Sequence, residues 1–132
     1  MTALDGSETH ANLAEAFIND SARSALHAWF AQQADIEGRP EEAAQFRARA
    51  ATGLSAAHGH LEFLADVGDP LFGQAIGDTD DNLAASASAV SSRETAAADH
   101  AVVARGEGLA AIADWFETLA TPAASDAAGA GS

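Results

Sequence analysis

Apolar residues recur every three or four positions along four stretches of the chain, which is the spacing of amphipathic helices. The stretches span about 9–36, 40–65, 79–105 and 109–121. Between the first two, Gly38 stands where glycine closes a last helical turn, and Pro40 stands where a first turn tolerates proline. A link this short predicts an antiparallel helix hairpin. Pro122 should end the fourth helix.

The segment between the second and third helices has a different composition. It contains Gly68, Pro70, Gly73 and Gly77, which indicates a connection rather than a further element. Fully extended, it could span up to ~40 Å, roughly the length of a long helix. We therefore expect a crossover that places the third helix parallel to the second.

The two halves of the chain repeat the same residues at a constant offset of 70 positions: Glu37-Gly38 recurs as Glu107-Gly108, and Phe46 recurs as Phe116. Two copies are too few for a solenoid and predict a duplicated helix–turn–helix unit. The predicted fold is an all-α four-helix bundle, built from two duplicated antiparallel hairpins joined by a long crossover. The expected parts are a lead-in at 1–8, hairpins at about 9–66 and 79–121, the crossover at 67–78 and a disordered tail at 122–132.

The chain carries a net charge of −14, from 20 acidic and six basic residues, and every basic residue is arginine. Acidic chains without lysine resemble the proteins of salt-in halophiles, where molar salt screens self-repulsion. Such a charge argues against nucleic acid or an anionic membrane as a partner. The absence of cysteine excludes disulfides and thiol chemistry. Because we find no signal-peptide pattern and no membrane-spanning apolar run, we expect a soluble, cytoplasmic protein.

The chain resembles a known family over roughly 9–120, in both halves of the repeat. The first half of this resemblance rests on Asn12-Leu13, Ala16-Phe17, Phe30-Ala31, Glu37-Gly38, Ala43, Phe46 and Ala50. The second half rests on Gly77-Asp78-Thr79, Asn82-Leu83, Glu107-Gly108, Ile112 to Phe116 and Leu119-Ala120. With these residues the chain resembles the rubrerythrin-type ferritin-like domain. The resemblance implies a bundle whose core holds two irons between glutamates and Glu-x-x-His pairs.

The family's ligand positions are almost all replaced in this chain. Asp20 keeps a carboxylate, whereas four positions fall on Gly53, Ala56, Val90 and Arg93. The last two fall on Ala123 and Asp126, beyond Pro122, where the fourth helix should have ended. Two irons need several oxygen and nitrogen donors in one buried place, which glycine, alanine and valine do not supply. We therefore expect no cofactor and no catalytic residue, with the inherited di-iron chemistry lost.

Polar residues on the inner stripes of the helices leave two alternatives open. Asp20, His60 and Glu94 could form a new single-metal site, or they could be ordinary paired polar residues. Helix rise places Glu94 about one turn and His60 about two turns below Asp20, so we expect a diagonal ladder rather than a cluster. Arg93 is predicted to pair with Asp20 or Glu94, replacing the metal's charge; the alternative is that its side chain extends to solvent.

Together these features favour a non-catalytic ferritin-like structural or interaction protein. We expect a homodimer, or another protein partner, bound through the bundle surface. The short fourth helix should leave a groove lined by Ala50, Gly53 and Ala57 that could accept a helix. The alternatives are a divalent metal (iron) binding or storage protein with a rebuilt site, or a rubrerythrin-like oxidoreductase.

Overall fold

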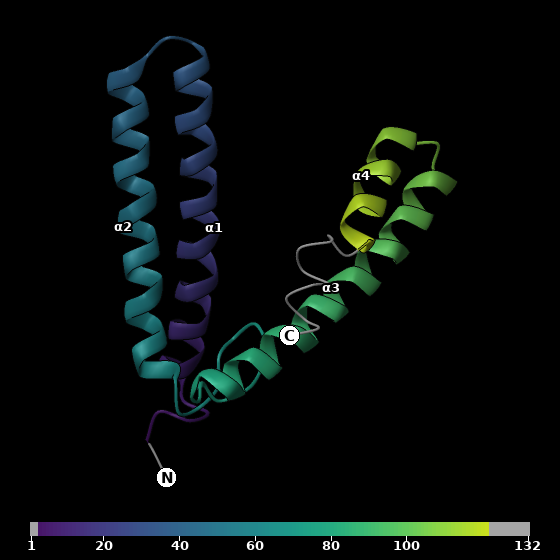
Figure 1. Cartoon of the computed structure of the whole chain (residues 1–132). Helices are drawn as coiled ribbons and strands as arrows, with labels where there is room; N and C mark the ends of the chain where they lie inside the picture. Colours follow the sequence, from purple (N-terminus) through teal and green to yellow (C-terminus); the bar gives the residue numbers. More distant parts are fainter. Residues whose placement is uncertain (1–2, 122–132) are drawn as a thin grey trace. The chain divides into compact units, whose positions relative to one another are not determined.

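The computed structural model describes residues 3–121, and within this range the chain forms four α-helices and no strand (Figure 1). The helices are α1 (Glu8–Ile36), α2 (Pro40–Leu64), α3 (Thr79–Gly106) and α4 (Ala110–Ala120). The all-α class expected from the sequence is therefore confirmed, and each helix begins and ends close to its predicted position. The tail predicted at 122–132 lies outside the described residues.

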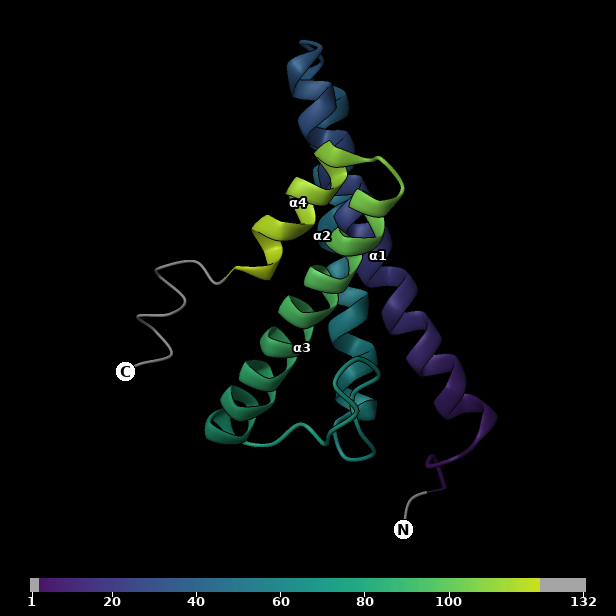
Figure 2. The same cartoon turned by 90° about the vertical axis from the view of Figure 1, so that its right-hand side faces the viewer.

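The chain divides into two compact units, Met1–Gly77 and Asp78–Ser132. The first contains α1 and α2, and we call this pair the first hairpin; the second contains α3 and α4, the second hairpin. In each unit the two helices run antiparallel and lie side by side in both views (Figures 1 and 2).

The turns of the two hairpins have the same geometry at corresponding positions, 70 residues apart. Gly38 and Gly108 adopt the left-handed conformation, with φ of 74° and 80°, which explains why glycine stands there. The residue after each glycine donates its backbone N–H back to the last helical turn. These bonds are Arg39 N to Ala34 O at 2.8 Å and Leu109 N to Ala104 O at 2.9 Å.

Two of the three long helices, α1 and α3, begin at side-chain caps. Ser7 Oγ accepts the backbone N–H of His10 at 3.0 Å at the start of α1. Asp78 Oδ1 accepts the backbone N–H of Asp81 at 2.9 Å at the start of α3. Each bond satisfies one of the free N–H groups that open a helix, so the starts of α1 and α3 are set by local chemistry.

The connection after α2 is ordered by one carboxylate. Asp69 accepts the backbone N–H groups of Leu71, Phe72 and Gln74. Partial burial alone would raise the pKa of Asp69, but the combined backbone hydrogen bonds to its charged form outweigh burial and lower that pKa. Residues 67–78 thus contain a hydrogen-bonded loop, and the crossover expected there stays a prediction.

Alanine dominates the interior of both hairpins, and Leu64 is the one larger buried side chain among the described residues. The buried alanines are Ala31, Ala34, Ala43 and Ala57 in the first hairpin, and Ala97, Ala101, Ala104 and Ala113 in the second. Small side chains allow two helix backbones to approach closely.

The predicted groove of small residues on α2 is not open, so this prediction is wrong. Ala57 is only 1% exposed, and a Cβ atom added to Gly53 would lie 3.2 Å from the backbone oxygen of Asp20 on α1. The small residues let α1 pack directly on α2, whereas the prediction was that their surface would be free to bind another helix.

In the second hairpin, α4 covers only part of α3. α4 has 11 residues and α3 has 28, which correspond to lengths of about 16 and 42 Å. The buried residues of α3 start at Ala97, and none of residues 79–96 is buried. Among the described residues of this unit, more than half of α3 therefore has no partner helix.

None of the helices in the described part of the chain combines the length and the apolar character needed to cross a membrane.

Candidate functional site

Asp20 of α1 and His60 of α2 form a polar contact between the helices of the first hairpin. His60 Nε2 lies 2.8 Å from Asp20 Oδ2, and the two side chains are 25% and 26% exposed. These are two of the three metal-ligand candidates predicted from the sequence. The structure brings them together directly, without the separation of two turns that the helix rise predicted.

The direction of the two side chains accounts for this contact. An added Cβ at Gly53 would lie 3.2 Å from Asp20 O and 3.4 Å from Ser24 Cβ, so Gly53 faces the turn of α1 between Asp20 and Ser24. In an α-helix each Cα–Cβ bond tilts toward the helix N-terminus. Because α1 and α2 are antiparallel, the side chains of Asp20 and His60 tilt toward each other along the hairpin axis. This convergence closes the gap between them.

The arginine next to Asp20 is Arg23 of the same helix. Its Nη1 atom lies 3.8 Å from Asp20 Oδ1, and its side chain is 69% exposed, so screening by water leaves this ion pair little energetic weight. Arg93 and Glu94 lie on α3. The ion pairs described within the second hairpin join Arg105 to acidic residues of α4 and do not include either of them. A pairing between Arg93 and Asp20 would join the two units and stays a prediction.

The surroundings of the Asp20–His60 pair limit its chemistry. Ser24 lies one turn along α1, but its hydroxyl donates to Ala50 O at 2.6 Å and is occupied in linking the helices. Among residues 3–121, no group of three or more histidine or acidic side chains is placed to hold a metal ion. Asp20 and His60 thus supply two donors, whereas a tetrahedral metal site takes four ligands.

His27 belongs to an aromatic cluster near the turn of the first hairpin. Its ring stacks on Phe46, with centroids 6.4 Å apart and planes at 19°, and Phe30 meets Phe46 at 5.4 Å. The second hairpin has a ring pair at the corresponding positions, His100 and Phe116, with centroids 5.2 Å apart. These rings pack the hairpin ends, which accounts for His27 as a structural residue.

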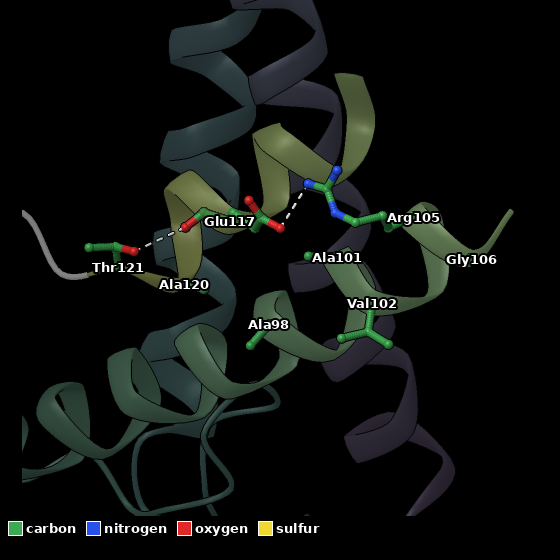
Figure 3. Close-up of a pocket in the computed structure, with 8 residues that line it drawn as sticks. All are labelled: Ala98, Ala101, Val102, Arg105, Gly106, Glu117, Ala120 and Thr121. Carbon is green, nitrogen blue, oxygen red and sulfur yellow. Dashed lines mark hydrogen bonds and ion pairs between the residues drawn. The ribbon is translucent and has the colours of Figure 1, made fainter. Parts of the chain in front are cut away.

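A cleft of about 690 Å³ lies within the second hairpin (Figure 3). It is lined by Ala98, Ala101, Val102, Arg105, Gly106, Glu117, Ala120 and Thr121. Arg105 Nη2 donates to Asp114 at 2.9 Å and to Glu117 at 2.8 Å, and the hydrogen bonds to these two carboxylates raise the pKa of the guanidinium. Both carboxylates already neutralise Arg105, so the cleft has no unpaired positive charge that could bind an anion. Its remaining walls are mostly small and apolar.

Large apolar side chains lie on the surfaces of both hairpins. Trp29 is 55% and Trp115 is 59% exposed. Other exposed apolar residues on the helices include Ile18, Leu26, Ile36, Leu54 and Phe63 in the first hairpin, and Leu83, Val102, Val103 and Ile112 in the second. Clusters of such residues on a protein surface mark sites of contact with other molecules.

Fold and site together define a class: an all-helical protein of two alanine-cored hairpins with a polar Asp–His contact inside the first. No family model matches the chain, and no curated protein matches it.

Proposed function

We propose that the chain is a non-catalytic helical scaffold of the rubrerythrin-like, ferritin-like type, which has lost its di-iron site and associates with itself. In this proposal the two hairpins pack as a four-helix bundle, and bundles pair through apolar helix faces. The observation that carries the proposal is the inverted distribution of apolar side chains: alanines are buried, while both tryptophans, the isoleucines and three of the six phenylalanines are exposed.

Alanine-cored hairpins gain little from burial alone. Removing a large apolar side chain from water is worth about 1.5–3 kcal/mol, and an alanine contributes far less. The first part of α3 also gains little from burial, because no residue from 79 to 96 is buried. Assembly of hairpins, and then of copies, buries the large side chains that the hairpin interiors leave outside.

The correspondence between the two hairpins supports the ferritin-like part of the proposal. Glycine turns, their backbone hydrogen bonds and a ring pair recur 70 residues apart. Such recurrence is what a bundle made by duplicating one hairpin would have. The loss of the di-iron site is supported by Gly53, which stands where the family has the glutamate of its first Glu-x-x-His pair. Gly53 packs against α1 and has no side chain that could bind a metal.

The proposal is tested by sedimentation equilibrium over a range of protein and potassium chloride concentrations, with helix content followed by circular dichroism. We expect a reversible oligomer whose population grows with salt, because salt screens the repulsion between chains of charge −14. A folded chain that remains monomeric at molar salt and high protein concentration would contradict self-association.

A second candidate function is favoured by one observation, the 2.8 Å convergence of Asp20 and His60. These residues could be two ligands of a divalent metal site completed by Glu94 or by another copy. The chain would be loaded anaerobically with Fe(II), Mn(II) or Zn(II), exchanged into chelator-treated buffer and analysed for metal per chain.

The matched control for this metal test is His58→Ala, since His58 is an exposed histidine two residues from His60 on the same helix. Retention of one metal per chain that is lost in Asp20→Ala and His60→Ala, and kept in His58→Ala, would establish the metal site. Equal retention in all variants would mean loose binding by the acidic surface. An additional loss in Glu94→Ala would identify the third ligand.

A further inference from the structure

The outward side of α1 carries a second apolar stripe. Its positions follow the alternating four- and three-residue steps of a coiled-coil seam. They are Ile18, Ala22, Ala25, Trp29, Gln32 and Ile36, and we call them the outer seam. The buried residues of α1 that face α2 are Ala31 and Ala34. At about 100° of rotation per residue, Trp29 lies roughly opposite Ala31 around the helix, so α2 does not cover the outer seam.

The outer seam is exposed along its whole length. Ile18, Trp29 and Ile36 are 43%, 55% and 77% exposed, and the three positions between them are exposed as well. A strip with a tryptophan and two isoleucines in water is unfavourable unless something covers it.

The outer seam is also free of charge in a chain of net charge −14. Between residues 18 and 36 the charged residues are Asp20, Arg23 and Asp35, and none of them belongs to the seam. Two identical acidic chains repel each other over most of their surface. An uncharged strip is where a second copy can approach without placing carboxylate against carboxylate.

The order of residues along the outer seam suits an antiparallel copy of itself. An antiparallel register centred on residue 27 pairs Ile18 with Ile36, Ala22 with Gln32, and Ala25 with Trp29. The largest side chain then lies opposite one of the smallest, twice by symmetry. A parallel register would instead place tryptophan against tryptophan, and it would align the helix dipoles unfavourably.

We propose that the outer seam is the interface between two copies of this chain, with the α1 helices antiparallel about a two-fold axis near residue 27. This inference rests on the self-association proposed above and names the surface that carries it. Such a contact is isologous, so it closes as a dimer and leaves no open end for further growth.

The second hairpin does not repeat the outer seam. The α3 positions that correspond to Ala22, Ala25 and Trp29 are Ser92, Thr95 and Asp99, so their side chains are polar or charged. α4 has only 11 residues and extends about 16 Å, whereas the seam extends about 27 Å. A second copy of α1 matches the seam in length and in polarity.

One helix–helix seam of about 27 Å lies at the small end of specific protein interfaces. The dimer should therefore dissociate on dilution. Most of its stability should depend on Trp29, because large aromatic residues at the centre of an interface dominate binding.

The first test compares Trp29→Glu with Leu71→Glu by sedimentation equilibrium of the full chain in molar potassium chloride. Leu71 is 68% exposed in the loop after α2, so its variant adds the same charge outside the seam. We expect Trp29→Glu to raise the dimer dissociation constant on the order of 100-fold and Leu71→Glu to change it less than about twofold. Unchanged circular dichroism would show that both variants keep their helices.

The outcomes separate this inference from the proposed function. A wild-type chain that is monomeric under these conditions would refute self-association itself. A wild-type dimer that Trp29→Glu does not weaken would refute the outer seam alone, because the copies would then associate through another surface.

A cross-linking test determines the register. The chain has no cysteine, so introduced thiols are the only ones present. Ile18 and Ile36 lie about 27 Å apart on one helix, too far for a disulfide within a chain. On oxidation, the double variant Ile18→Cys/Ile36→Cys should form a covalent dimer linked from position 18 to position 36, and neither single variant should. A link from 18 to 18 in the Ile18→Cys variant would overturn the antiparallel register.

Discussion

The close approach of α1 and α2 makes a sharp prediction about two glycines on the same helix. Gly53 faces α1, where an added Cβ would lie 3.2 Å from Asp20 O and 3.4 Å from Ser24 Cβ. Gly59 also lies inside α2, but an added Cβ there meets nothing within 4 Å. The perturbation is to replace each glycine by leucine.

Two energies act on these variants, and only one of them differs between the sites. Replacing an interior helical glycine by leucine gains about 0.8 kcal/mol in helix propensity at either position. At Gly53 the larger side chain must also push α1 away, and overpacking of this kind costs about 1–3 kcal/mol. The propensity gain cancels in the comparison, so Gly53→Leu should be less stable than Gly59→Leu by about 1–3 kcal/mol.

The assay is urea unfolding followed by circular dichroism at one fixed salt and protein concentration. The two alanine variants provide a graded series: Gly59→Ala should stabilise by about 1 kcal/mol, and Gly53→Ala by less. Equal stability of Gly53→Leu and Gly59→Leu would show that α1 does not pack closely on α2 at this level, and the account of the alanine-cored hairpin would then be refuted.

Three further predictions concern single residues. The pKa of Asp69 is lowered, so its contribution to the free energy of unfolding is full above the ordinary carboxyl pKa of about 4 and is lost as the pH falls through the lowered value. In urea titrations between pH 7 and pH 2, the free energy of unfolding should therefore fall less in Asp69→Ala than in the wild type. Asp78→Ala should lower the free energy of unfolding by about 1 kcal/mol and fray the start of α3, because the helix loses its cap. Amide exchange at the start of α3 should then be faster than in the wild type, and equal exchange would mean that the cap contributes nothing. Gly38→Ala should destabilise by about 1–2 kcal/mol in thermal unfolding, because its φ of 74° is unfavourable for alanine; an unchanged midpoint would contradict a left-handed turn.

The helices could be predicted from the sequence because their signals are local. Apolar spacing placed all four helices, and Gly38 and Gly108 marked turns whose left-handed φ angles are observed. Caps and breakers act over a few residues, so no knowledge of distant contacts is needed.

The site was less predictable because it depends on contacts between helices. The helix rise gives the level of a Cα atom, but the side chains of Asp20 and His60 lean toward each other and meet at 2.8 Å. Gly53 looked like part of an empty groove because the sequence does not show how closely two helices pack. The outer seam carried a readable signal in its four- and three-residue steps, but the inner stripe on the same helix has that spacing too.

The three-residue link between α1 and α2 has a consequence for the order of events during synthesis. Contacts within the first hairpin join residues that are close in sequence, a topology that folds in microseconds to milliseconds. Translation proceeds at about 5–20 residues per second, so the residues after Gly77 take seconds to appear. The first hairpin should thus be complete, with Trp29 and Phe63 still in water, before the second one exists. Neighbouring ribosomes on one messenger would each carry an exposed α1 face, which would favour pairing of copies during translation.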